Sequence, residues 1–302
     1  MRQGALETWP SLPYESWKDT LATLHLWLQV VGKIRLALAP MVNHWWQVTL
    51  YVTPRGLTTS AIPSGERMFQ IDFDFIDHVL EVSTSDGKRA RFALEPMPVS
   101  QFYQSVMDAL NALEIDVSIR TTPCEMPDVI PFERDEVHAS YDREYAHRFS
   151  RALQQADRVL GIFRGRFIGK VSPVHLFWGA PDLAVTRFSG RVAPPHPGGF
   201  PNMADWITRE AYSHEVSSAG WWPGGAGMEP MFYSYAYPEP AGFAQAAVSS
   251  GAYYHEQLRE FVLPYETVRT SNDPDALLLA FLQTTYAAAA TLAKWDRSAL
   301  ER

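Results

Sequence analysis

The second half of the chain gathers side chains that can bind and orient a small molecule. Imidazole, carboxylate and guanidinium groups occur there beside Gly- and Pro-rich loops and are interleaved with indole and phenol rings. Loops held on a rigid scaffold are where binding residues concentrate, and polar groups that converge in an aromatic concavity are the usual form of a ligand site. The candidate ligand-binding residues are His175, Trp178, Asp182, Arg187, His214, Glu215, Trp221, Trp222, Tyr235, Tyr237 and Glu239.

Within this set, His214 is suited to acid–base chemistry because an imidazole titrates near neutral pH. His214 and Glu215 are adjacent, so on a strand they face opposite sides and do not pair with each other. Tyr233, Tyr235 and Tyr237 alternate with small residues and therefore share one strand face. The sequence predicts that His214 points into a cavity bordered by at least two of Trp178, Trp221, Tyr235 and Tyr237.

Plainer structural roles explain the same residues. In that interpretation the rings pack in the core, and His214 bonds a backbone carbonyl beside a surface carboxylate, Glu215. Arg187 either binds an anionic group or forms a salt bridge to Asp182 or Glu215. Asp182 and Arg187 differ in strand parity, which disfavours a pair between them on a regular strand. No motif fixes a reaction, so no catalytic residue is assigned.

Common metal, phosphate and nucleophile motifs are missing from the sequence. The histidines form neither an H-x-x-x-H nor an H-x-H pair, and Cys124 is the single cysteine, so we expect no metal site and no cofactor. Gly32-Lys33 and Gly169-Lys170 lack the upstream glycine of a phosphate loop. No G-x-S-x-G elbow supports serine-hydrolase chemistry.

Charge and composition narrow the class of partner. The net charge is −8, which argues against nucleic acid as the main partner because phosphate binding needs a basic surface. Residues 1–10 lack the basic and apolar segments of a signal peptide, and no stretch approaches eighteen uninterrupted apolar residues. We therefore expect a cytoplasmic protein with no membrane partner; its oligomeric state is left open.

Hydrophobic periodicity predicts the elements that must position the candidate residues. Apolar steps of three and four indicate helices over about 16–31 and 135–167, from about 100, and from Asp273-Pro274. Alternation indicates strands near 47–53, 69–75, 79–83 and 89–94, with a hairpin turn at Ser85-Asp86-Gly87. In the second half it indicates strands near 174–177, 183–188, 212–217 and 231–237, followed by helices from about 242 and 253.

Short sequence echoes suggest an internal duplication. Val31-Gly32-Lys33-Ile34 is echoed by Ile168-Gly169-Lys170-Val171, and Glu81-Val82-Ser83 is echoed by Glu215-Val216-Ser217. The fold class predicted is α+β, with two diverged repeats of an antiparallel sheet that has helices on one face, in a pseudo-twofold arrangement. The first repeat spans 1–133 and the second spans 134–302 with the C-terminal helix, together forming one compact unit.

Several longer stretches resemble those of an uncharacterised family, domain-of-unknown-function family 5996. The stretches that carry the resemblance are His44-Trp45-Trp46, Ser172-Pro173-Val174-His175-Leu176-Phe177-Trp178-Gly179, Asp182 to Arg191, Ser213 to Gly224 and Tyr235 to Pro240. The resemblance covers nearly the whole chain, from about 9 to 301, and implies one family-wide unit. It supplies no activity and no catalytic residue.

Two functions remain after these steps. The first is a small-molecule-binding protein, catalytic or not, with an aromatic-lined pocket in the second repeat. The second is a structural or protein-interaction module without catalytic activity, whose exposed aromatic rings meet a partner. The two differ in whether the rings of the second half line a closed cavity or lie on an open face.

Overall fold

A computed structural model describes residues 7–302 and shows a mixed α+β protein with two antiparallel sheets. The elements of the first half are α1 (Tyr14–Leu38), η1 (Asn43–Val48), β1 (Tyr51–Thr53), β2 (Gly56–Thr58), β3 (Ile62–Ser64), β4 (Arg67–Asp74), β5 (Val79–Thr84), β6 (Arg89–Ala93), α2 (Val99–Ala112) and η2 (Phe132–Arg134). Those of the second half are α3 (Arg143–Gly165), β7 (His175–Phe177), β8 (Asp182–Val192), α4 (Asp205–Ala211), β9 (His214–Trp222), β10 (Met231–Tyr237), η3 (Phe243–Gln245), β11 (Tyr253–His255), β12 (Glu260–Pro264), α5 (Tyr265–Arg269), α6 (Pro274–Leu292) and α7 (Arg297–Leu300).

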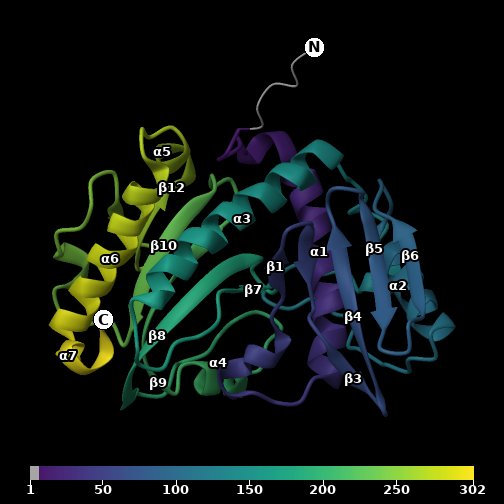
Figure 1. The fold of residues 1–302 in the computed structure, drawn as a ribbon, viewed down its shortest axis with the longest axis horizontal. Helices are drawn as coiled ribbons and strands as arrows, with labels where there is room; N and C mark the ends of the chain where they lie inside the picture. The colour runs from purple at the N-terminus through teal and green to yellow at the C-terminus, as the bar shows by residue number, and fades with distance from the viewer. Residues whose placement is uncertain (1–6) are drawn as a thin grey trace.

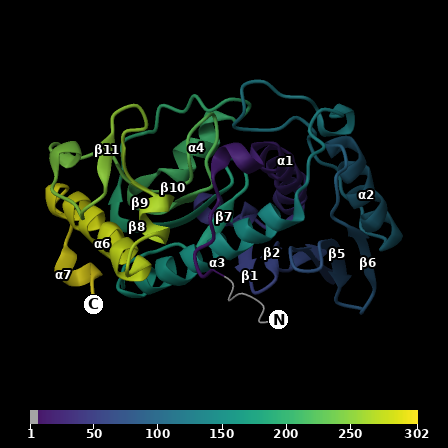
Figure 2. The same ribbon diagram turned by 90° about the horizontal axis from the view of Figure 1, so that it is seen from above.

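The first sheet has the strand order β1-β2-β4-β5-β6, with β3 pairing β4 (Figure 1). Alternation along β4 buries Phe69, Ile71 and Phe73 on one face of the sheet. Phe73 meets Phe102 of α2, which stacks in turn on Trp27 of α1 with ring centroids 4.6 Å apart. Both α1 and α2 therefore cover the apolar face of this sheet (Figure 2).

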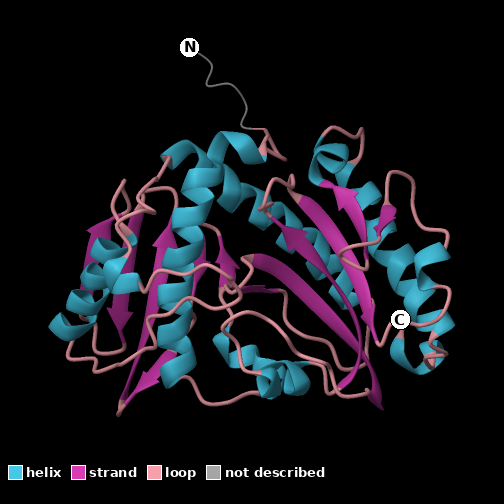
Figure 3. Cartoon of the chain, turned by 180° about the vertical axis from the view of Figure 1, so that it is seen from behind, coloured by secondary structure: helices cyan, strands magenta, loops and turns pink. Residues whose placement is uncertain are grey.

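The second sheet has the order β11-β12-β10-β9-β8-β7. One face packs against α3 and α6: Trp221 of β9 lies against Phe149 of α3, and Arg187 of β8 lies over Phe163 of α3 and Tyr286 of α6. Figure 2 shows α3 and α6 on one side of β8 to β10 and α4 on the other. That other face is crossed mainly by loops, as the view from behind in Figure 3 shows.

The two sheets meet through their first strands. Leu50, just before β1, and Leu176 of β7 exchange two backbone hydrogen bonds, of 2.9 and 2.8 Å. Trp178 follows β7 directly, and its side chain packs against α1. Its Nε1–H donates to Val48 O, at the end of η1, at 2.7 Å. A Cβ at Gly32 would collide with the Trp178 ring, so α1 reaches this junction only because residue 32 is glycine.

Much of the predicted secondary structure is confirmed. The β5–β6 hairpin turns at the predicted residues, and the Asp273 side chain caps α6 by accepting from the Ala276 N–H at 3.0 Å. The helices predicted from 242 and 253 are wrong: the first is the single 3-10 turn η3, and the second is replaced by β11 and β12. Pairing of β12 with β10 decides this segment, since ladder bonds to a neighbouring strand outweigh weak helical periodicity.

The strand predicted near 47–53 is also shorter than expected. Residues 43–48 form η1, where His44 and Trp45 both have left-handed backbone angles with φ of 60° and 64°. Such angles cost about 1–3 kcal/mol for residues other than glycine and persist where surrounding contacts impose them. Those contacts involve the site described below.

The sequence echoes do not fall on equivalent elements. Gly32 lies inside α1, whereas Gly169 follows the end of α3. Glu81 lies on β5, the fourth strand along the first sheet, whereas Glu215 lies on β9, the third strand counted from β7 in the second sheet. Each half does run helix, antiparallel meander, helix. The echo offsets therefore do not join positions in equivalent elements of the two halves. The duplication, and the division at 133/134, stay predictions; residues 1–6 of the first repeat lie outside the described residues.

Two helices, α1 and α6, are long and apolar enough to cross a membrane by length and composition alone. For α1, 72% of the apolar window is buried inside the protein, and for α6, 39%. Core helices pass the same test, and α1 contributes Trp27, Val30 and Val31, all without exposed surface, to the core.

The contact at Gly32 gives a first prediction. Ala normally stabilises a helix interior by about 1 kcal/mol relative to Gly, but Gly32→Ala drives a methyl group into the Trp178 ring. We expect a loss of about 1–3 kcal/mol of unfolding free energy, measured by urea denaturation. The matched control is Gly161→Ala inside α3, where nothing lies within 4 Å of the added Cβ and stability should rise. A stabilised Gly32→Ala variant would contradict the packing described.

Candidate functional site

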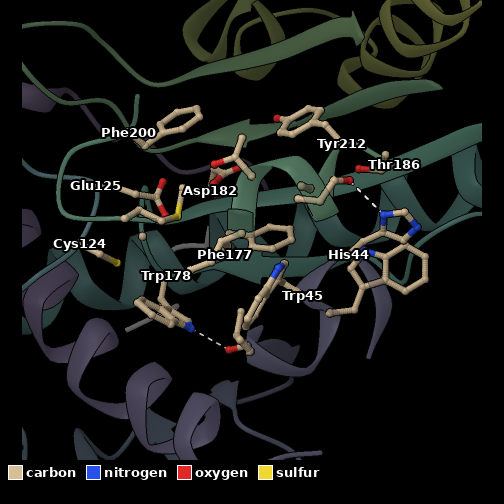
Figure 4. Close-up of a pocket in the computed structure, with 18 of the residues that line it drawn as sticks. His44, Trp45, Cys124, Glu125, Phe177, Trp178, Asp182, Thr186, Phe200 and Tyr212 are labelled. Atoms are coloured by element: carbon tan, nitrogen blue, oxygen red, sulfur yellow. Dashed lines mark hydrogen bonds between the residues drawn. The ribbon is translucent and has the colours of Figure 1, made fainter. Parts of the chain in front are cut away.

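A cavity of about 410 Å³ lies on the face of the second sheet that α3 and α6 leave open. The strands β8, β9 and β10 form its floor, and η1, α4, the end of α1 and the loop 120–125 cover it. Figure 4 shows the Asp182 carboxylate between Glu125 on one side and Tyr212 on the other, with the rings of Phe177 and Phe200 around it. The lining is mostly apolar, so charged groups in it are poorly solvated.

Strand parity decides which side chains reach the floor. Thr186 of β8 and Ser218 of β9 face the cavity and share a hydrogen bond of 2.9 Å between their hydroxyl oxygens. Tyr233 and Tyr235 of β10 face it as well, as their alternation predicts. Gly220 of β9 has no Cβ, and the Tyr233 hydroxyl occupies the space that a Cβ would take.

Asp182 is the central carboxylate of the site. The Tyr233 hydroxyl donates a hydrogen bond to Asp182 Oδ2, and the hydroxyls of Tyr212 and Tyr235 are bonded to each other at 2.7 Å. Burial raises the pKa of Asp182 to about 6, although the hydrogen bond from Tyr233 opposes that rise. Burial also raises the pKa of Tyr235 to about 12, so these phenols stay protonated and act as hydrogen-bond donors.

Glu125 is brought to the cavity by a polar stripe on α1. His25 lies 2.8 Å from Gly179 O, Gln29 exchanges hydrogen bonds with the backbone N–H and O of Cys124, and Lys33 donates to Thr122 O at 2.7 Å. These three residues are four apart, so they share one helix face. They hold the loop 122–125 against the second sheet.

The Glu125 carboxylate fills the space beside Gly179 that a Cβ would otherwise occupy. Burial, with a smaller contribution from the negative charge of Asp182, raises the pKa of Glu125 to about 7. Glu125 and Asp182 therefore lie within electrostatic reach of each other. Across residues 7–302, no Lys, Arg or His nitrogen lies within 4.0 Å of either carboxylate as an ion pair.

A second cavity of about 850 Å³ adjoins the first and shares part of its wall. The residues that line both cavities are Asp182, Phe200, Tyr212, Tyr233 and Tyr235. Glu260, at the start of β12, lines the second cavity, and burial together with the charge of Asp182 raises its pKa to about 8. Asp182 thus interacts electrostatically with a carboxylate in each cavity.

The other end of the first cavity is built on the left-handed pair His44 and Trp45. The Lys170 ammonium donates to His44 Nε2 at 2.6 Å, so Nδ1 carries the proton and donates to Ala211 O at 3.0 Å. Burial lowers the pKa of His44, which agrees with a neutral ring. Trp45 packs on Trp206 of α4 with centroids 5.1 Å apart. These contacts hold α4 over the cavity.

Six of the candidate residues from the sequence line the two cavities. Trp178, Asp182 and Tyr235 line the first cavity. Asp182, Trp222, Tyr235, Tyr237 and Glu239 line the second. Glu239 already accepts a hydrogen bond from the Tyr254 hydroxyl at 2.6 Å and pairs with Arg259, so its charge is compensated.

The other five candidates line neither cavity. Trp221 and Arg187 point to the helical face, where the Arg187 guanidinium lies 3.5 Å from the Phe163 ring centroid. His175 is buried at the junction of the halves, bonded to Thr49, and its pKa is lowered to about 3 by burial. Glu215 pairs with Arg191 at 2.6 Å.

His214, the fifth of these residues, departs most from the sequence-based prediction. It bonds the Ser213 hydroxyl at 3.0 Å and lies edge-on to His44, outside the lining of both cavities. The prediction that His214 points into a cavity is therefore wrong. As the first residue of β9 it precedes the part of the strand that forms the floor.

Sequence reasoning missed most of the charged groups that define the site. Glu125 and the loop that carries it come from the first half, and Glu260 lies in a segment predicted as helix. Tyr233 was recognisable, since its alternation with Tyr235 places it on the same strand face. Among residues 7–302, no group of three or more His, Cys, Asp or Glu side chains is arranged to hold a metal ion.

Comparison with known proteins gives one match. A family model described as "Family of unknown function (DUF5996)" matches residues 9–302, which is nearly the whole chain. No curated protein and no solved structure matches.

The raised carboxyl pKa values predict a pH-dependent stability. Because Asp182, Glu125 and Glu260 bind protons more tightly when folded than when unfolded, their contribution is complete below about pH 4 and is lost as pH rises through 6–8. Glu125→Gln removes one such group, so the loss of unfolding free energy between pH 5 and pH 8 should shrink by about 1–2 kcal/mol. Urea denaturation at both pH values measures it.

The control for this prediction is Glu66→Gln, which alters an exposed carboxylate in the turn before β4. It should leave the pH dependence of unfolding unchanged. An equal pH dependence in wild type and Glu125→Gln would show that the Glu125 carboxylate is not in the environment described.

Proposed function

The chain belongs to a family of unknown function, DUF5996, and within that family we propose that it binds a small molecule in the cavity over the second sheet. The observation that carries the proposal is an aromatic-walled cavity containing two carboxylates, Glu125 and Asp182, without a basic partner among the described residues. Buried carboxylates are costly unless they are paired, and proteins keep them where they serve a ligand or a reaction.

The size and cover of the cavity support a ligand of low molecular mass. Its volume of about 410 Å³ lies within the range of small-molecule sites. The cover includes residues in strained conformation, His44 and Trp45, which is common at functional sites. The exposed ring of Phe200 lines the cavity as well and adds to its apolar wall.

An acid–base reaction on the bound molecule is the second function we propose. Carboxyl groups with pKa values of about 6 and 7, as in Asp182 and Glu125, exchange protons readily at neutral pH. Two carboxyls held at different pKa values can act as acid and base for one substrate. The interaction module without a ligand is the competing function, and the experiment below separates it from both.

A cytoplasmic location, the absence of nucleic-acid and membrane partners and the internal repeat remain proposals. The net charge of −8 supports the second of these, because it disfavours a phosphate backbone. The matching order of helix, meander and helix in the two halves supports the repeat.

Filling the cavity tests the proposed function. Ala211, at the end of α4, lines the first cavity, and Ala211→Trp would occupy its volume from the cover side. In a thermal-shift screen of a metabolite and fragment library, we expect compounds that stabilise wild type to lose at least about 90% of their affinity for this variant. Direct titration of each hit provides the dissociation constants.

The matched control is Ala93→Trp on β6, an exposed position of the first sheet outside both cavities. It should bind each hit as wild type does. If no compound in the library distinguishes Ala211→Trp from Ala93→Trp, the small-molecule proposal fails, and the interaction module becomes the better explanation.

A further inference from the structure

We propose that the ligand is a linear aliphatic diamine or polyamine that spans both cavities, with its ammonium groups beside two or all three of the carboxylates Glu125, Asp182 and Glu260. This inference rests on the proposed function and deepens it, because it names the chemical class that the site takes. It follows from the order of the carboxylates, the lack of a basic partner for them among residues 7–302 and the aromatic walls between them.

The three carboxylates form a row with Asp182 in the middle. Glu125 lines only the first cavity, Glu260 lines only the second, and Asp182 lines both. The charge of Asp182 acts on Glu125 and on Glu260, whereas neither glutamate is perturbed by the other. A ligand that satisfies all three must therefore pass from one cavity to the next along the shared wall.

Three basic side chains, Lys33, Arg120 and Arg259, line the cavities, but none of them forms an ion pair with the three carboxylates of the row. Lys33 donates to Thr122 O and lies over the Phe132 ring, Arg120 is exposed, and Arg259 pairs with Glu239. Since no protein cation in the described part of the chain pairs with the row, its charge is neutralised either by bound protons, as the raised pKa values of the three carboxyls indicate, or by cations that come with the ligand. An anionic ligand would add to the repulsion among the carboxylates.

The walls between the carboxylates suit methylene chains carrying cations. Tyr212, Tyr233 and Tyr235 line both cavities, and Trp222 extends the second. Aromatic faces attract ammonium groups, most strongly where water is excluded, and cover the apolar stems between them. Tyr233 and Tyr235 stack with centroids 6.1 Å apart, which makes a continuous aromatic surface along the row.

A metal ion or a single amine fits this arrangement less well. A metal requires ligands that converge on one point, and among residues 7–302 no group of three acidic or metal-binding side chains does so. One ammonium group compensates one carboxylate and leaves its neighbour buried with its charge. Two or more amines separated by flexible methylenes match carboxylates that are distributed over two cavities.

Isothermal titration calorimetry of the full chain at pH 7.5 tests the proposal, with 1,5-diaminopentane and spermidine as probes and 1-aminopentane as the mono-amine comparison. We expect 1,5-diaminopentane and spermidine each to bind at least about tenfold more tightly than 1-aminopentane, with one molecule per chain. Asp182→Asn should weaken polyamine binding at least about tenfold, and Glu125→Gln and Glu260→Gln should each weaken it as well.

The matched control is Glu215→Gln, which removes an acidic charge from the same sheet outside both cavities. It should retain wild-type affinity, and circular dichroism establishes that all variants are folded. Equal polyamine binding by wild type and Asp182→Asn would overturn the proposal, because the amines would then bind elsewhere.

Two further outcomes separate this inference from the function on which it rests. If no polyamine binds while library compounds bind in a manner that Ala211→Trp abolishes, the amine assignment is wrong and the ligand-binding function stands. If neither polyamines nor library compounds distinguish Ala211→Trp from Ala93→Trp, both proposals fall.

Discussion

The packing of the Trp178 indole on Gly32 is the contact on which the rest of the structure depends. Only glycine at position 32 lets α1 approach the second sheet so closely, and the Trp178 N–H then bonds Val48 O at the start of the first sheet. The bridge between Leu50 and Leu176 lies beside this contact. One tight junction thereby sets the position of α1 relative to both sheets.

The site follows from that placement of α1. Its stripe of His25, Gln29 and Lys33 meets the loop 122–125 and Gly179 only because the helix lies against the second sheet. Burial lowers the pKa of His25 to about 4, so this histidine is a neutral hydrogen-bonding group at physiological pH. By holding the loop 122–125 in place, α1 also positions Glu125 in the apolar cavity beside Asp182.

The two faces of the second sheet separate the helix-packed core from the two cavities. Trp221 and Arg187 lie on the helical face, where the guanidinium packs between the rings of Phe163 and Tyr286. Asp182 and Tyr233, on the opposite face, are hydrogen-bonded to each other in the first cavity, whose lining is mostly apolar. A single strand such as β8 therefore supplies a buried structural cation and a carboxylate that lines both cavities, five residues apart and of opposite parity.

The sequence alone determined what local patterns can encode. Alternation placed Tyr233, Tyr235 and Tyr237 on one face and separated Asp182 from Arg187, and the proline and aspartate signals located the start of α6. Periodicity could not place the segment after 242, because strand pairing with β10 decides it. Nor could it join Glu125, Asp182 and Glu260, which come from a loop, β8 and β12. Only tertiary structure brought these carboxylates into shared cavities, because burial and charge coupling depend on distances in space and not on spacing along the chain.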